Sequence, residues 1–126
     1  MKTDKKHFKV FKKECKKLIG SLGLSDWELC FTHNDLDCRG NCHTQIPGFM
    51  CKLNLGVDWG EGQEYKITNK DIKRTAFHEV LHLLLTEIRG CANDRYMNIQ
   101  EYDEIEHRTI RRIENFLMKN TKGKLK

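Results

Sequence analysis

The clearest structural signal in the chain is the segment Thr68-Asn-Lys-Asp-Ile-Lys-Arg-Thr-Ala-Phe-His-Glu-Val-Leu-His-Leu-Leu-Leu-Thr-Glu-Ile-Arg-Gly90. Thr68 or Asn69 can cap a helix, and Asp71 follows Thr68 by three residues, which is an aspartate version of the capping box. Glycine is suited to the position after a helix end, so the sequence predicts a helix that runs to Arg89 and stops at Gly90. Apolar side chains cover most of its circumference, which predicts that the helix is largely buried.

This helix carries the spacing His78-Glu79-Val80-Leu81-His82. Histidines four residues apart lie about 40° apart around a helix axis, so both rings can reach one ion. H-E-x-x-H is the signature of zinc proteases, in which the glutamate takes a proton from a water whose pKa the zinc has lowered. The alternative is a pair of hydrogen-bonded histidines that bind no metal.

A catalytic zinc ion needs a third protein ligand, which we expect from a last helix over Ile99 to Lys119. The longer form of the motif is excluded, because Ile88 stands where its third histidine would be. Glu106 falls within the apolar arc of this helix, whose other members are Tyr102, Ile105, Thr109, Ile110, Ile113, Phe116 and Leu117. A carboxylate in an apolar stripe is rare unless it is paired or metal-bound. We therefore predict Glu106 as the third ligand, with His107 second; the alternative is a salt bridge from Glu106 to Arg74 or Arg89.

The remainder of the chain predicts a small sheet between helices. An amphipathic helix is expected over about Lys5 to Leu22, and a strand over Trp27 to Thr32. A second strand region spans Cys42 to Leu55 with a break near Pro47-Gly48, and Glu64 to Ile67 can add one more short strand. The order of helix, strands and two further helices indicates an α+β fold. We expect a single domain over 1–126, with mobile basic ends at about 1–4 and 120–126.

Composition narrows the class of protein. The chain has 126 residues, 38% of them hydrophobic and 33% charged, which suits one domain and leaves no stretch apolar enough to cross a membrane. Lysines occupy the N-terminal region where a signal peptide would be apolar, so we expect a cytoplasmic protein. We also expect a monomer. The net charge of +5 is compatible with nucleic acid but does not require it.

The six cysteines contain no C-x-x-C pair. Cys38, Cys42 and Cys51 could compose a second, structural zinc site, but their spacing does not suit one. Scattered reduced cysteines that behave as small buried hydrophobic residues are the favoured interpretation.

Two stretches carry a family resemblance: Phe77-His-Glu-Val-Leu-His-Leu-Leu-Leu85 and Glu104-Ile-Glu-His-Arg-Thr-Ile-Arg-Arg-Ile-Glu-Asn115. They resemble the small zincin-type metallopeptidases of phage and prophage genomes, which are similar in plan to minimal gluzincins. The resemblance implies a zincin-like fold in which a small mixed sheet packs on the active-site helix and its edge strand lines the substrate cleft. It further implies one zinc ion on His78, His82 and Glu106, with Glu79 as general base and acid, in the host cytoplasm if the chain is phage-encoded.

The resulting prediction is a zinc-dependent metallopeptidase that hydrolyses a peptide bond of a peptide or protein substrate. The group that would stabilise the oxyanion carries no recognisable spacing, and Tyr96, Tyr102, His43 and His107 are all candidates. The alternative function is a zinc-containing interaction or regulatory module, with DNA as its candidate partner, whose catalytic site is weak or idle.

Overall fold

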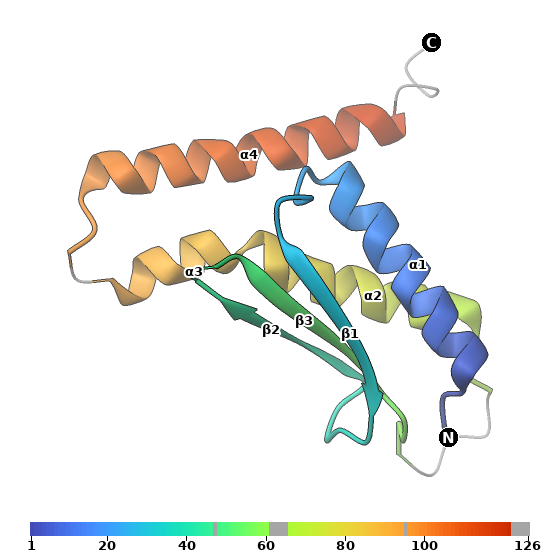
Figure 1. Ribbon diagram of the computed structural model, residues 1–126. Coiled ribbons are helices and arrows are strands. Elements are labelled where there is room, and N and C mark those ends of the chain that lie inside the picture. The colour runs from blue at the N-terminus through green and yellow to red at the C-terminus, as the bar shows by residue number, and fades with distance from the viewer. Residues whose placement is uncertain (47, 61–65, 95, 122–126) are drawn as a thin grey trace.

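The structure is a computed structural model that describes residues 1–46, 48–60, 66–94 and 96–121. It is an α+β fold in which one helix and three strands precede three further helices (Figure 1). In chain order the elements are α1 (Lys5–Ser21), β1 (Glu28–Asn34), β2 (Gly40–Gln45), β3 (Met50–Gly56), α2 (Asn69–Leu84), α3 (Thr86–Asn93) and α4 (Ile99–Thr121). The α+β class and the mixed sheet are confirmed, while the sequence predicted two helices after the sheet where the structure has three.

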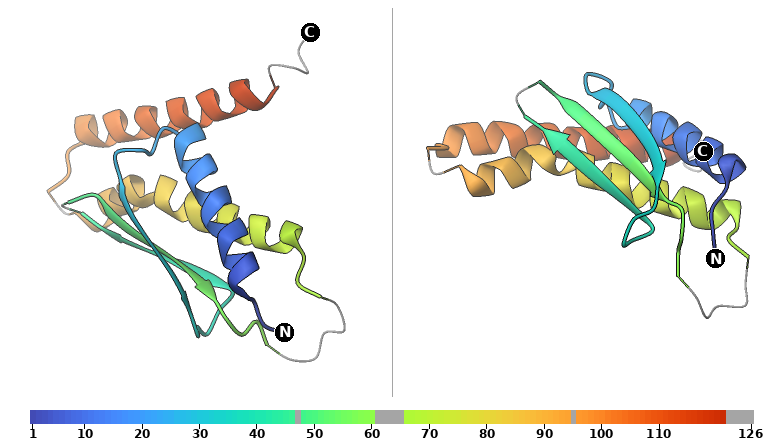
Figure 2. Two further views of the ribbon diagram at one scale, coloured as in Figure 1. Left: turned by 45° about the vertical axis from the view of Figure 1, so that its right-hand side comes forward. Right: turned by 60° about the horizontal axis from the view of Figure 1, so that its bottom comes forward.

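The three strands form a mixed sheet in the order β1-β3-β2. β3 pairs parallel with β1, with Phe31 opposite Leu53, and antiparallel with β2, where Cys42 lies opposite Leu53. β2 is therefore an edge strand. The helices lie together on one side of the sheet (Figure 2). The predicted break near Pro47-Gly48 falls between β2 and β3; Pro47 lies outside the described residues, and Gly48 has a positive φ of 103°.

The core lies between the sheet, α1 and α2. Its centre contains fully buried side chains from all three elements, namely Phe11, Cys15, Leu53, Leu55, Ile72, Ala76 and Val80. Alternation along β3 sends Cys51, Leu53 and Leu55 into this core, while Lys52 points to solvent. α2 therefore packs against both α1 and the sheet, and this packing fixes the direction in which its other side chains point.

The start of α2 agrees with the sequence prediction, but its end does not. Thr68 is the N-cap, and its hydroxyl accepts a hydrogen bond from the Asp71 backbone while Asp71 accepts one from the Thr68 backbone. The helix ends at Leu84 rather than Arg89, and Gly90 lies inside α3. The Thr86 hydroxyl donates to the carbonyl of His82 at 3.0 Å, a back-bond of the kind that bends helices.

α4 matches the predicted span closely, but its apolar arc is not a core face. Thr109 is buried, whereas Ile110, Ile113 and Leu117 are 42%, 39% and 53% exposed. α4 runs antiparallel to α2 and α3 (Figures 1 and 2), and the Phe116 ring stacks on Phe77 with 6.3 Å between centroids. The helix lies against the others along one edge and leaves much of its apolar stripe uncovered.

The N-terminal end, which the sequence predicted to be basic and mobile, contacts the residues that follow β3. Thr3 is buried, its backbone N–H donates to the Val57 carbonyl at 2.8 Å, and the N-terminal ammonium donates to the Gly60 carbonyl at 2.8 Å. The C-terminal prediction falls mostly on 122–126, outside the described residues. Of the short strand predicted over Glu64 to Ile67, the first two residues also lie outside them, and the last two are not in a strand. Among the helices that the structure describes, none is long and apolar enough to span a bilayer.

Candidate metal centre

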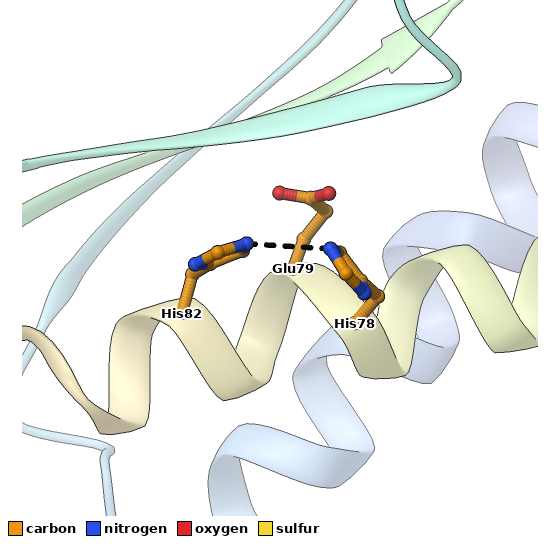
Figure 3. A group of neighbouring side chains, drawn as sticks. All are labelled: His78, Glu79 and His82. Atoms are coloured by element: carbon orange, nitrogen blue, oxygen red, sulfur yellow. Dashed lines mark hydrogen bonds between the residues drawn. The ribbon is translucent and has the colours of Figure 1, made fainter.

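His78 and His82 face each other on the solvent side of α2 (Figure 3). Their Nε2 atoms lie 3.3 Å apart, and the rings are inclined at 75° to each other. Zinc bound at about 2.0–2.1 Å by two nitrogens of a tetrahedral site sets those nitrogens about 3.3–3.4 Å apart. Both side chains are exposed, so an ion can reach them from solvent. This separation is that of a hydrogen bond between the two rings, drawn as a dashed line in Figure 3, and it also equals the separation of two corners of a zinc tetrahedron.

Glu79 lies beside this pair and points toward the sheet (Figure 3). One carboxylate oxygen and the two histidine nitrogens lie within 4.8 Å of one another. The residue is only 5% exposed, and within the described ranges no hydrogen-bond donor contacts its carboxylate. Burial raises the pKa of Glu79, against smaller opposing effects of His78, His82 and His43. A buried carboxyl with a raised pKa next to possible metal ligands has the properties expected of a general base.

The edge strand β2 holds Glu79 in this position. Its first residue, Gly40, packs so closely on α2 that an added Cβ would lie 3.0 Å from Thr75 Cγ2 and 3.6 Å from Glu79 Cγ. At the other end of the contact, the Thr86 hydroxyl donates to that of Thr44 at 3.4 Å. β2 therefore passes over Glu79 (Figure 3).

Glu106 is not brought to the histidine pair. It is half-buried on α4, where its charge and its hydrogen bond with the Tyr102 side chain raise the pKa of Tyr102. Neither Arg74 nor Arg89 forms an ion pair with it, which we state for the residues that the structure describes. The salt bridge considered as the alternative is thus not formed, but the predicted ligation is not formed either.

The register between α4 and the neighbouring helices explains the separation. Phe77 stacks on Phe116, and Glu87 pairs with Arg108 at 2.6 Å. Because the helices are antiparallel, these contacts place His82 level with about Ile113. Glu106 precedes Ile113 by two helical turns, which is about 10 Å along the axis.

The other residues considered from the sequence as a zinc ligand or as oxyanion donors are His107, Tyr96, Tyr102 and His43. His107, the second choice as ligand, forms a hydrogen bond with the Asp103 carbonyl on its own helix at 2.7 Å. Tyr96 is 87% exposed, and Tyr102 is beside Glu106. His43 is the oxyanion candidate whose charge acts on Glu79, although its register opposite Lys52 puts it on the solvent face of the sheet.

The cysteines are reduced, and those considered for a second metal do not gather into one. Cys42 and Cys51 are neighbours on β2 and β3 with sulfurs 3.7 Å apart, whereas Cys38 is exposed and donates to the Gly40 carbonyl. Within the described part of the chain, they do not form a group of three ligand atoms.

Two arginines that the sequence did not assign to the group lie near it, although Arg74 was considered as a salt-bridge partner of Glu106. Arg74 precedes His78 by one helical turn, and Arg39 precedes Gly40; both line a cavity that His78 and Glu79 also line. The repeat of Arg74, His78 and His82 at four-residue steps on one helix face was the available signal. Comparisons of the chain with protein-family models, with curated proteins and with solved structures find no match.

Proposed function

We propose that the chain is a zinc-dependent metallopeptidase with His78 and His82 as metal ligands and Glu79 as the general base and acid. The observation that carries the proposal is the 3.3 Å separation of the two Nε2 atoms, which equals the separation expected for two ligands of tetrahedral zinc. The resemblance of the motif segments to small zincin-type metallopeptidases supports the same conclusion. A bound zinc ion would supply a Lewis acid that polarises the scissile carbonyl and increases the acidity of water.

Glu79 is suited to move a proton between water and the leaving amine. Its carboxylate is buried under β2, lacks a hydrogen-bond donor among the described residues, and has a raised pKa. It can therefore accept a proton from the attacking water and return it to the amine as the peptide bond breaks. β2 offers an unpaired edge above Glu79, to which an extended substrate can add as a strand.

We propose Glu106 as the third ligand, which requires α4 to slide along α2 by about two turns when metal binds. Two features support this step. The carboxylate has no described ion-pair partner to lose, and the exposed apolar stripe of α4 shows that the present register buries little of that surface. If α4 does not slide, the site consists of the two histidines and ligands from outside the chain.

The first experiment measures zinc per chain by elemental mass spectrometry after reconstitution and desalting. We expect one zinc per chain, lost in His82→Ala and retained in His107→Ala, an exposed histidine on α4. Absence of zinc from the wild-type protein would refute the proposal.

Glu79→Gln separates the two functions considered. A peptidase should keep its zinc but lose turnover of a peptide mixture followed by mass spectrometry, because the proton acceptor is gone. An interaction module should bind its partner equally well with either side chain, and wild-type turnover that survives the substitution would rule out the proposed role of Glu79.

A further inference from the structure

A cavity of about 300 Å³ opens directly beside the proposed catalytic group. One wall is α2, which contributes Arg74 as well as His78 and Glu79, and the opposite wall is the segment that leads into β2, with Cys38 and Arg39. A substrate whose scissile bond lies over Glu79 would thus place a neighbouring side chain at this cavity. The cavity therefore has the position of a specificity site.

The cavity is lined by two arginines, Arg39 and Arg74, and by two carboxyl groups, Glu79 and Asp71. Hydrogen bonds from Thr68 lower the pKa of Asp71, and the charge of Arg39 contributes to lowering it. In the described residues neither Arg39 nor Arg74 has a carboxylate within ion-pair distance. The one other acidic side chain in the lining, Asp71, already accepts hydrogen bonds from the backbone N–H and the hydroxyl of Thr68, each at 2.9 Å. Asp71 is therefore committed to the helix cap, and the two guanidinium groups remain available to an incoming anion.

Arg39 is also held in place. Its guanidinium lies over the ring of Trp59 at 5.0 Å from the centroid, a cation–π arrangement that limits its motion. The Trp59 indole in turn donates to the Gly56 carbonyl at 3.1 Å. A guanidinium fixed in this way loses less freedom when it binds a carboxylate, which it can do through two parallel hydrogen bonds.

We propose that this cavity selects substrates that carry an acidic side chain, aspartate or glutamate, next to the scissile bond, with Arg39 and Arg74 as the recognising groups. The inference rests on the proposed peptidase function, and it gives that function a substrate class. Because both arginines are exposed, the preference should weaken as salt concentration rises.

The test uses fluorescein-labelled peptides in matched pairs that differ only in glutamate versus glutamine at positions around the cleavage site found with a random peptide mixture. For zinc-loaded wild-type protein we expect kcat/KM to be about tenfold higher for the glutamate member of one pair. Arg74→Gln and Arg39→Gln should each reduce that ratio by about threefold or more. Lys73→Gln, which removes the same charge from an exposed neighbour outside the cavity, should leave it unchanged.

Reversing the charge at residue 74 distinguishes a direct effect on substrate preference from an indirect effect on the structure. Arg74→Glu should reverse the preference, so that a lysine peptide is cleaved faster than its glutamate counterpart. Equal cleavage of the glutamate and glutamine peptides by wild type, or a glutamate preference that survives both arginine substitutions, would overturn the proposal.

Binding distinguishes failure of the cavity from failure of the peptidase. Fluorescence anisotropy with the Glu79→Gln protein reports affinity for the same peptides without turnover. If no peptide is cleaved but glutamate peptides bind more tightly through Arg39 and Arg74, the proposed function fails and the acid-binding cavity stands. If peptides are cleaved without regard to acidity, the cavity proposal fails and the peptidase stands.

Discussion

Replacing Glu79 by glutamine should stabilise the metal-free protein at neutral and alkaline pH. Glu79 is 5% exposed, and burial is the main cause of its raised pKa. Water still reaches the carboxylate oxygens, because among the described residues no fully buried side-chain oxygen lacks a hydrogen-bond partner. Glutamine has nearly the same shape without the charge, so we expect the free energy of unfolding at pH 8 to rise by about 0.5–1 kcal/mol.

The pH dependence gives the sign of this effect. Because the folded-state pKa of Glu79 is higher than the unfolded-state value, the folded protein holds its proton to higher pH. The cost of ionisation is absent below the unfolded-state pKa of about 4.3, grows as pH rises through the folded-state pKa, and is complete above it. The gain from Glu79→Gln should therefore shrink as pH falls from 8 toward 4.5.

Urea unfolding of metal-free protein, followed by circular dichroism in the presence of a chelator, measures this difference. Glu28→Gln removes the same charge from an exposed position on β1 and should change the free energy of unfolding by less than about 0.5 kcal/mol. A Glu79→Gln protein that is no more stable than wild type at pH 8, or whose gain is the same at both ends of the pH range, would refute the argument that burial destabilises the carboxylate.

Two further predictions address the third ligand and the core. Glu106→Gln should weaken zinc binding by about tenfold or more, as measured in competition with a chromophoric chelator. The matched change Glu104→Gln, at an exposed position on the same helix, should leave zinc affinity unchanged. Equal zinc affinities for wild type and Glu106→Gln would remove Glu106 from the site. Alkylation of the native protein by iodoacetamide should label the exposed Cys30 and Cys38 first. Cys15 should be spared, because it is fully buried and burial raises the pKa of its thiol. If mass spectrometry finds Cys15 labelled as fast as Cys38, the position of α1 in the core is contradicted.

Local signals explain how much of the fold could be predicted from the sequence. The cap at Thr68 and Asp71 depends on residues three apart, and both hydrogen bonds of the capping box are present. The strand predicted up to Leu55 is likewise local, and in the structure its alternation puts Cys51, Leu53 and Leu55 on the buried side. The early end of α2 escaped prediction because threonine is tolerated within helices, and the pattern does not show that its hydroxyl takes up the carbonyl of His82.

The candidate metal site also has parts that one helix determines and parts that depend on how two elements pack. His78, Glu79 and His82 come together because they lie on one helix, where side chains four residues apart are neighbours on the same face. The arginine cavity, by contrast, joins Arg74 on α2 to Arg39 in the loop before β2, and only the close approach at Gly40 brings the two segments together. The interpretation of single residues was sound where one element decides the geometry and incomplete where two elements meet.

The third ligand depends most strongly on such a meeting of elements. A helical wheel identified Glu106 correctly as a member of the apolar arc, but a wheel gives an angle around one axis and says nothing about displacement along it. The pairs Phe77–Phe116 and Glu87–Arg108 set that displacement, and they leave Glu106 about two turns from His82. A shift that brought Glu106 to the metal would have to break the ion pairs of Glu87 with Arg108 and Arg112. The Arg112 and Glu87 side chains are only 15% and 12% exposed, so this pair costs more to break than a surface pair. The gain in zinc affinity from a third ligand would have to exceed the cost of both ion pairs and of the Phe77–Phe116 contact.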